Sequence, residues 1–400
     1  TLPPGAVIGR YTILGVIGAG GMGVVYVAEQ DRPRRRVALK VLRAAIASAR
    51  MLRRFEYEAE VLGRLQHPGI AQVYEAGTFT EGRLSRPFIA MELISGLSLV
   101  EHAQKASLPV RARVELLAKV ADAVQHAHQS GVIHRDLKPA NIIIAPASSP
   151  APPPDTASSP TQPLIPPATG TGDQPKILDF GVARGLTPDG HDAQHTTAHT
   201  AVGQIIGTLP YMSPEQLDAR AAGADSRSDI YALGVIGYEL LTGRLPLNVA
   251  SLPLPEAARR IHDDQPERLS RIDRQLRGDL DTIIAKALAK DPQRRYPSAS
   301  EFAADLRRFL AGEPISARQD SAVYVLRAQI RKHKALVAGL CMGVVGLVTF
   351  AVYAAFQADA KDKLAIARQQ EATRARVAQT EALSQKERAD DNARRLETEL

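Results

Sequence analysis

The 400-residue sequence predicts an α+β fold with two unequal lobes, a small β-rich lobe followed by a larger helical lobe. Two observations predict these lobes: residues 11–93 favour short strands, and residues 97–310 carry the 3.6-residue apolar period of helices. A third observation, an uncharged apolar run of 22 residues at 335–356, predicts one membrane-spanning helix after the lobes. We expect residues 358–400 to form a helical extension.

The β-rich lobe is predicted from three short β-branched runs, at 11–17, 24–28 and 37–41, which glycine or charged turns separate. Within this lobe the stretch 51–65 has apolar residues at helical spacing and predicts a helix. The helical lobe is predicted from longer apolar stripes. These stripes lie at 110–130, 226–241, 279–289 and 300–310.

A proline-rich insert interrupts the helical lobe at residues 145–175, where ten of 31 residues are proline. Such a composition cannot bury enough apolar surface to order itself, so we expect a disordered loop. The runs on either side, 142–144 and 176–178, are typical of paired short strands. The insert would then be an enlarged hairpin tip, where added length costs little entropy.

The charge distribution favours a membrane over a nucleic acid as a partner. The formal net charge is +7, and a basic cluster at 331–334, with Arg327 nearby, directly precedes the apolar run. The sequence has no nucleic-acid signature, so we expect a lipid bilayer and no nucleic acid. Residues 311–334 would be a juxtamembrane segment. The single cysteine, Cys341, excludes an intramolecular disulfide, and residues 1–10 do not resemble a signal peptide.

A glycine-rich turn with the pattern Gly18-x-Gly20-x-x-Gly23 lies between the first two predicted strands. A dinucleotide-binding turn would need a helix directly after the glycines, whereas a β-former run follows here. A Walker P-loop would need a Gly-Lys-Ser/Thr sequence, which the turn lacks. We therefore predict a strand–turn–strand hairpin whose backbone N–H groups can approach phosphate oxygens closely.

A lysine on the next predicted strand is the candidate phosphate-binding cation. Lys40 lies 17 residues after Gly23, where its ammonium can reach the α- and β-phosphates of a nucleotide. A buried lysine needs a carboxylate to keep it charged and oriented. Glu58, on the predicted helix of the same lobe, is the preferred partner, with Glu56 and Glu60 as the alternatives.

The segment 134–141, His-Arg-Asp-Leu-Lys-Pro-Ala-Asn, carries the side chains that phosphoryl transfer requires. Asp136 can accept the proton of a substrate hydroxyl, and Lys138 can lie against a γ-phosphate. Asn141 can hold Mg²⁺ (or Mn²⁺) through its amide oxygen. Asp179, the first residue of Asp-Phe-Gly, supplies a carboxylate for the same metal.

In this order the motifs resemble those of the eukaryotic-like (Hanks-type) protein kinase family, over residues 11–310. The resemblance rests on the glycine turn, Val-Ala-Leu-Lys at 37–40, the segment 134–141, Asp-Phe-Gly, and Ser-Pro-Glu at 213–215. It implies the two-lobed protein kinase fold. It also implies transfer of the ATP γ-phosphate to protein hydroxyls, with Mg²⁺ (or Mn²⁺) as the metal.

The resemblance implies a nucleotide site between the lobes. Met91 would lie at the back of the adenine slot, the backbone of 92–94 would pair with adenine, and Val25, Ala38 and Ile143 would form walls. The implied nucleotide-binding residues are Ile17, Gly18, Ala19, Gly20, Gly21, Met22, Gly23, Val24, Val25, Ala38, Lys40, Met91, Glu92, Ile94 and Ile143.

Two structural roles are implied as well. Asp229 would brace the segment 134–141, and Arg295 would pair with Glu215. Two features depart from the family pattern: Ser213 stands where alanine is common, and the insert lengthens the separation of the two metal ligands to 38 residues. Neither departure removes a catalytic group.

The Lys-Pro pair at 138–139 resembles the serine/threonine branch of the family, and Thr208 would bond Asp136 and the lysine of this pair. Arg135 would pair with a phosphate on the activation segment, 179–215, so we expect autophosphorylation there. The candidate acceptors are Thr196, Thr197 and Thr200, with Thr200 as the first choice.

The order of the predicted parts, a kinase domain, a juxtamembrane stretch and one membrane span, resembles that of bacterial receptor-like serine/threonine kinases. Because ATP and protein substrates are cytosolic, we expect a single-pass protein of the inner (plasma) membrane with a cytoplasmic kinase domain, although the charge asymmetry across the span is weak. The outer helix, a weak coiled coil, would allow a homodimer, and a sensor region would follow Leu400. The alternatives are a pseudokinase that binds nucleotide without turnover and a membrane scaffold.

Overall fold

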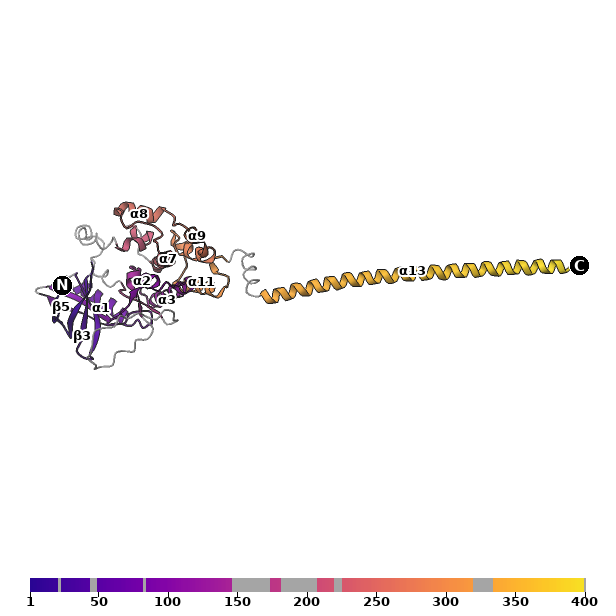
Figure 1. Cartoon of the computed structure of the whole chain (residues 1–400). Helices are drawn as coiled ribbons and strands as arrows, with labels where there is room; N and C mark the ends of the chain where they lie inside the picture. The colour runs from indigo at the N-terminus through magenta and orange to yellow at the C-terminus, as the bar shows by residue number, and fades with distance from the viewer. Residues whose placement is uncertain are drawn as a thin grey trace. The chain divides into compact units, whose positions relative to one another are not determined.

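The computed structural model describes residues 1–20, 23–43, 49–81, 84–145, 173–180, 207–218, 225–318 and 334–398. The chain divides into two compact units, Thr1–Val325 and Leu326–Leu400. Within the first unit a β-rich lobe is followed by a helical lobe, as the sequence predicts (Figure 1).

The β-rich lobe is an antiparallel sheet of six strands in the order β1-β2-β3-β4-β6-β5, drawn in indigo to purple in Figure 1. The three strands predicted at 11–17, 24–28 and 37–41 are confirmed as β2, β3 and β4. The strands are β1 (Val7–Ile8), β2 (Tyr11–Ala19), β3 (Gly23–Gln30), β4 (Arg35–Leu42), β5 (Val73–Glu81) and β6 (Leu84–Glu92).

Side-chain alternation gives this sheet two apolar faces. On β4, Leu39 and Val41 join a cluster confined to the sheet. Ala38 and Leu42 instead join the large core cluster, which continues into the helical lobe. Because side chains repeat every second residue along a strand, Lys40 shares the face of Ala38 and Leu42. The strand thus directs the Lys40 ammonium toward the helical lobe.

One helix, α1 (Ala49–Gly63), belongs to the β-rich lobe and confirms the helix predicted at 51–65. Phe55 and Leu62 on its apolar face are buried in the large core cluster. The helix ends at Gly63, a residue that is costly inside a helix, two residues before the predicted end.

A second, three-stranded sheet joins the start of the helical lobe to the insert. It has the order β7-β8-β9, with β7 (Leu97–Ser98), β8 (Ile142–Ala145) and β9 (Gln174–Ile177). In β8 and β9, Ile142 pairs with Ile177 and Ala145 with Gln174. The predicted pairing of the two flanks of the insert is therefore confirmed, while residues 146–172 lie outside the described residues.

The helical lobe is built around α3 and α7, which pack against each other. Helix α7 is apolar on nearly all sides and almost entirely buried. Asp225 caps its first turn by accepting from the Arg227 N–H, and Gly243 ends it in the left-handed conformation. The predicted helices of this lobe are confirmed as α3, α7, α10 and α11. The helices are α2 (Leu99–Lys105), α3 (Val110–Gln129), α6 (Pro214–Leu217), α7 (Ser226–Thr242), α8 (Leu254–Asp263), α9 (Leu269–Ile272), α10 (Asp279–Ala287) and α11 (Ala299–Ala311), with 3₁₀ turns η1 (Pro139–Asn141), η3 (Leu209–Tyr211), η4 (Arg274–Leu276), η5 (Pro292–Arg294) and η6 (Ser316–Arg318).

Two glycines are required by close backbone approach. A Cβ on Gly23 would overlap the carbonyl oxygen of Val41 on the neighbouring strand. A Cβ on Gly96, just before β7, would overlap the carbonyl oxygen of Ile144. The last glycine of the predicted glycine turn therefore has a packing role, because it lets β3 lie against β4.

The second unit is formed by α13 (Lys334–Thr398), a helix of 65 residues. It includes the span predicted at 335–356 and the extension predicted at 358–400 as far as Thr398, and it continues through residue 357 without a break. Large apolar side chains such as Met342, Leu347, Phe350 and Phe356 are more than 70 % exposed. Among the described residues this is the one helix long and apolar enough to cross a membrane. The run 335–356 of this helix carries no charged side chain on any side, which suits a lipid environment.

Candidate active site

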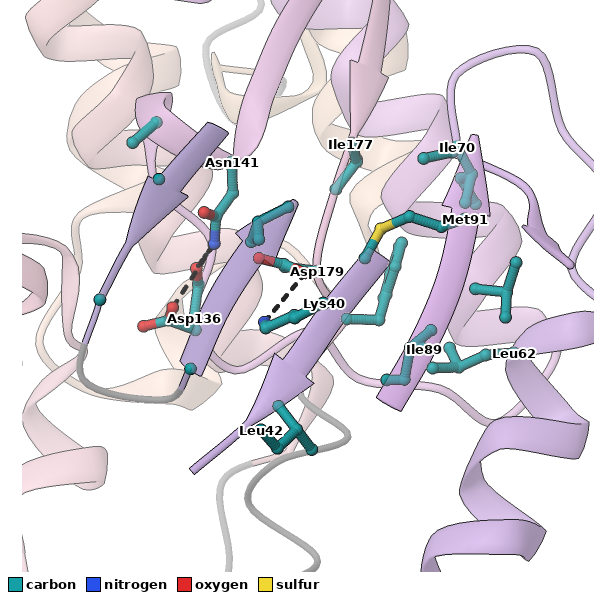
Figure 2. A pocket seen from close by; sticks show the side chains of 18 of the residues that line it. Lys40, Leu42, Leu62, Ile70, Ile89, Met91, Asp136, Asn141, Ile177 and Asp179 are labelled. Atoms are coloured by element: carbon teal, nitrogen blue, oxygen red, sulfur yellow. Dashed lines mark hydrogen bonds and ion pairs between the residues drawn. The ribbon is translucent and has the colours of Figure 1, made fainter. Parts of the chain in front are cut away.

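A cavity of about 420 Å³ is lined by residues of both lobes of the first unit. Hairpin β2–β3 and strand β4 contribute from the sheet, and the loop around Asp136 and the segment after β9 contribute from the helical lobe. Figure 2 shows Lys40, Asp136, Asn141 and Asp179 side by side in this cavity, although they come from separate elements. The arrangement places one ammonium, two carboxylates and one amide around a common space.

Lys40 forms an ion pair with Asp179, with 2.9 Å between Nζ and Oδ1 (Figure 2). The Lys40 side chain is 11 % exposed and that of Asp179 is 28 % exposed. Partial burial strengthens such a pair relative to one in bulk water. Lys40 thus presents a fixed positive charge to the cavity, and Asp179 a fixed negative charge.

Asp136 lies at the centre of a hydrogen-bonded group. Lys138 Nζ donates to Asp136 Oδ2 at 3.0 Å and to Thr208 Oγ1 at 2.8 Å. Asn141 Nδ2 donates to the Asp136 backbone carbonyl at 2.9 Å and to Oδ2 at 3.4 Å. These bonds fix the Asp136 carboxylate. They engage the Asn141 amide through its nitrogen and not through its oxygen.

Asp229 holds the loop that carries Asp136. Its Oδ2 accepts from the His134 backbone N–H and its Oδ1 from the Arg135 backbone N–H, both at 2.8 Å. His128 on α3 adds a hydrogen bond of 2.7 Å to Oδ2. Arg135 has φ of 62°, a strained left-handed conformation for a residue with a Cβ. The Asp229 carboxylate, 1 % exposed, stabilises this bend of the loop.

The ionisation of Asp229 makes its contribution pH-dependent. Burial alone would raise its pKa, but hydrogen bonds and charge from His128 and His134 more than offset this and lower the pKa below 3.8. A carboxyl whose pKa is lower in the folded state contributes stability that is present above its unfolded pKa. That contribution is lost as pH falls through the folded pKa.

We therefore expect Asp229→Asn to be less stable than the parent at pH 7 and the difference to shrink below pH of about 4. Urea unfolding from neutral to acid pH measures the free energy of unfolding of both proteins. Asp263→Asn, which changes an exposed aspartate, is the matched control. A difference in the free energy of unfolding between the two proteins that stays constant down to the lowest pH would contradict this prediction.

Asp179 is held in place through its neighbour Phe180, which makes an aromatic contact. Phe180 is buried and packs on the His134 ring, with ring centroids 4.7 Å apart. His134 Nε2 lies 3.0 Å from the Leu178 carbonyl oxygen, and the Leu178 N–H donates to the Asn141 carbonyl at 2.7 Å. Asp179 itself has φ of 57°. The segment after β9 is thus fixed to the Asp136 loop, which keeps the two carboxylates in one cavity.

The chain matches the family model described as "Protein kinase domain" over residues 11–305. The chain belongs to the protein kinase family. The match covers both lobes and every motif that lines the cavity.

Named relatives of the kinase domain are bacterial serine/threonine kinases. The sequence is 37 % identical over 308 residues to serine/threonine-protein kinase PknB of Mycobacterium tuberculosis, an alignment that covers 76 % of this chain and 44 % of that protein. It is 36 % identical over 312 residues to the probable serine/threonine-protein kinase SCO3848 of Streptomyces coelicolor, covering 77 % of this chain and 41 % of that protein. The aligned region thus spans less than half the length of these curated relatives.

The fold also matches solved kinase domains. The crystal structure of the PknI kinase domain of M. tuberculosis superposes with a TM-score of 0.54 and 27 % sequence identity. The superposition covers 78 % of this chain and 100 % of the PknI chain.

A second buried ion pair stabilises the helical lobe of the kinase domain. Arg295 forms a two-pronged pair with Glu215, at 2.7 and 2.8 Å. Its remaining donors bond the carbonyls of Ala289, Arg227 and Lys290. This is the pair that the family resemblance implies, and it fixes the end of the activation segment to the region after α10.

Most of the predicted site residues line the cavity. Glu58 lies on α1, and its pairing with Lys40 stays a prediction, since the partner of Lys40 that the structure defines is Asp179. Gly21, Met22 and the three candidate threonines lie outside the described residues. The predicted residues in the lining are Gly18, Ala19, Gly20, Gly23, Val25, Lys40, Met91, Asp136, Lys138, Asn141 and Asp179; those that are not in it are Ile17, Val24, Ala38, Glu92, Ile94 and Ile143.

Strand geometry accounts for part of this division. Val25 packs against the large core cluster, whereas Val24, its neighbour in sequence, packs against the cluster on the opposite face of the sheet. The N–H of Glu92 donates to the Gln72 carbonyl at 2.8 Å. The Glu92 N–H is therefore engaged within the sheet, and the contact of the 92–94 backbone with adenine stays a prediction.

Sequence reasoning missed the apolar rear wall of the cavity. This wall combines the end of α1, the loop after it, β5, β6 and β9. Its apolar periodicity is the signal of any buried element, so it did not distinguish cavity lining from core. The ion pair between the Glu92 carboxylate and Lys176 Nζ, at 2.7 Å, was also missed. The rear wall consists of Leu62, Leu65, Ile70, Ala71, Val73, Ile89 and Ile177.

Proposed function

We propose that this chain is a protein kinase that transfers the γ-phosphoryl group of ATP to serine and threonine hydroxyls of protein substrates. The observation that carries the proposal is the shared cavity of Lys40, Asp136, Asn141 and Asp179. Positioning and charge stabilisation account for most of the catalysis of phosphoryl transfer, and these four groups provide both.

The cavity suits a nucleotide triphosphate with a divalent cation. Among the described residues, and apart from the adjacent residues of the chain, no atom lies within 4 Å of the position that a Cβ would take on Gly18 or Gly20, which leaves room beside the hairpin backbone for phosphate oxygens. Val25 and Met91 offer apolar contact for a base. Asn141 and Asp179 would hold Mg²⁺ (or Mn²⁺), an ion that proteins often bind through one or two side chains together with substrate phosphates.

Each polar side chain of the cavity then has a defined task, with ATP supplying the phosphoryl group. Asp136 accepts the proton of the substrate hydroxyl at its carboxylate. Lys138, held by Thr208 beside Asp136, offers positive charge next to the acceptor site. Lys40 and Asp179 neutralise each other, and a phosphate and a metal ion offer each of them an alternative partner of opposite charge.

Radiolabel transfer from γ-labelled ATP to serine, threonine and tyrosine peptides tests the proposal. We expect label on serine and threonine peptides, since the named relatives are serine/threonine kinases. The alternative of a pseudokinase is not favoured, because the chain retains the cation, the base and the metal ligands together. Nucleotide binding without transfer to any peptide would favour that alternative.

We further propose that α13 anchors the kinase domain in the inner membrane as a single-pass protein. At 1.5 Å per residue, the uncharged run of 22 residues is about 33 Å long and matches a hydrocarbon core of roughly 30 Å. The kinase domain would lie in the cytoplasm, where ATP and protein substrates are. The outer part of the helix would be available for a homodimer. Protease protection in intact cells tests this topology, and cleavage of the kinase domain from outside would contradict it.

Autophosphorylation of the activation segment is our expectation for regulation. Arg135 is half of the pair that would order the segment, and a threonine phosphate, with Thr200 as first choice, would be the other half. Mass spectrometry of the parent and of Asp136→Asn, both purified from the same host, measures this modification. We expect phosphate on the parent only. Equal phosphorylation of both proteins would show that a kinase of the host is responsible.

A further inference from the structure

Four arginines recur at every third position near the end of the kinase domain, and we call them the arginine cluster. They lie within and beside α9 and η4, and all four are exposed. Leu269 and Leu276, which alternate with them, are each 1 % exposed and belong to the large core cluster. The buried leucines fix these short elements, so the arginines are presented on the surface. The arginine cluster consists of Arg268, Arg271, Arg274 and Arg277.

The arginine cluster makes no ion pair with the carboxylates near it in the described part of the chain. Its four side chains and Ser270 line one surface hollow. Within the described part of the chain, none of the four guanidinium groups makes a hydrogen bond or ion pair. The nearby carboxylate of Asp281 accepts from the Leu269 N–H and from Ser270 Oγ, both at 2.9 Å. Asp273 accepts from the Gln275 N–H, and Glu267 is exposed. Residues 268–277 contain four arginines and one carboxylate, that of Asp273, while Glu267, Asp279 and Asp281 flank this range.

The cluster lies beside the place where the kinase domain leads toward α13. Helix α10 packs against α9, η4 and η6. Arg318 in η6 pairs with Asp279, the first residue of α10, at 3.2 Å, and Asp279 follows Arg277 by two positions. Residues 319–333 then join η6 to α13. Fully extended, such a tether reaches at most roughly 55 Å.

We infer that the arginine cluster is a docking surface for anionic lipid headgroups, which hold the kinase domain against the cytoplasmic leaflet. This inference rests on the proposed membrane anchor. The planar guanidinium fork matches phosphate oxygens, and clustered arginines are attracted to the negative surface of that leaflet. A short tether keeps the bilayer at high effective concentration, which favours lipid over a freely diffusing acidic peptide as the occupant.

Energy transfer in nanodiscs tests the docking directly. The full chain carries Cys341→Ser, which removes the native thiol, and Gln275→Cys in exposed η4 for a donor fluorophore. Acceptor fluorophores are placed on lipid headgroups. We expect the ratio of docked to undocked molecules to rise about tenfold or more when phosphatidylglycerol replaces part of the phosphatidylcholine. Raising the salt from about 0.1 M to about 1 M should reverse this, because the Debye length falls to about 3 Å.

Two matched variants distinguish an effect of the arginine cluster from an effect of the net positive charge of the protein. The quadruple change of the arginine cluster to glutamine should abolish the response to anionic lipid. The control removes the same charge from four exposed arginines of the β-rich lobe and should retain the response. The control changes are Arg32→Gln, Arg36→Gln, Arg43→Gln and Arg53→Gln.

Three outcomes would overturn the inference. Energy transfer that is independent of lipid charge, or that survives in the quadruple variant, would exclude headgroup docking by the cluster. Binding of a phosphorylated peptide by the parent but not by the quadruple variant, with no effect of anionic lipid, would assign the surface to a protein partner. Failure of the chain to insert into nanodiscs would contradict the anchor itself, and with it the docking.

Discussion

Replacing Asp136 with asparagine is expected to lower kcat by about 10²- to 10⁴-fold, the usual contribution of a positioned general base. Asparagine keeps the size of the side chain and an oxygen that can accept from Lys138 and Asn141. It cannot take up the proton of a substrate hydroxyl. The loss should therefore fall on kcat, with little change in KM for ATP or in the midpoint of thermal unfolding.

Steady-state phosphorylation of a serine peptide measures this effect, with Asp263→Asn as the control. Asp263 is exposed at the end of α8, outside the cavity, so its variant should retain the parent's kcat. An Asp136→Asn protein that is folded and transfers phosphate within a few-fold of the parent would show that Asp136 is not the base.

Arg295→Ala is expected to lower the free energy of unfolding by about 3–5 kcal/mol, the range for breaking a buried ion pair by removing one partner. The alanine would leave the Glu215 carboxylate, 16 % exposed, without its main cation. It would also remove the hydrogen bonds that Arg295 donates to three backbone carbonyls. Ser228 Oγ would still donate to Glu215, but a neutral hydroxyl cannot compensate the charge.

Urea unfolding of Arg295→Ala and of Arg294→Ala measures the free energy of unfolding of both variants. The comparison separates loss of the Arg295–Glu215 ion pair from loss of any arginine side chain. Arg294 is exposed, and Arg294→Ala should stay within about 0.5 kcal/mol of the parent, as surface substitutions usually do. Because Arg295 hydrogen bonds and charge lower the pKa of Glu215, against the effect of burial, the gap between Arg295→Ala and the parent should narrow at acid pH. A loss below about 1 kcal/mol at neutral pH would contradict the role given to this pair.

The sequence was most informative where local pattern dictates local structure. The β-branched runs predicted β2, β3 and β4, and the apolar period predicted α3 and α7. The two runs beside the proline-rich insert have the composition of short strands and were predicted to pair as a hairpin. The structure confirms this, since β8 and β9 pair. For each strand and helix, one short stretch of sequence determines the structure.

Contacts between distant segments were harder to predict. The ion pair of Lys40 with Asp179, which lies 139 positions away from the lysine in sequence, was not predicted, while the pairing of Lys40 with Glu58 stays a prediction. His128 reads as one polar residue in an amphipathic helix, yet it bonds the buried Asp229 carboxylate. Such pairings depend on how the lobes fold together, and no periodicity in the sequence encodes them.

The family resemblance supplied what the residues alone did not. The roles of Asp229 and Arg295 came from the resemblance, and the structure shows the bonds that each makes. The arginine cluster was not singled out from the sequence, because exposed arginines at every third position resemble an ordinary solvated surface. The ion pair of Arg318 with Asp279 places the cluster near the end of the kinase domain that leads toward α13, and this pair is visible only in the folded domain.

A crystal structure of the kinase domain with a non-hydrolysable ATP analogue and Mg²⁺ tests the central claim most directly. We expect the triphosphate to lie under the β2–β3 hairpin, with Lys40 on its phosphates and the metal on Asp179 and Asn141. The γ-phosphate should face the Asp136 carboxylate. A nucleotide bound outside the cavity, or with its phosphates directed away from Asp136, would contradict the account.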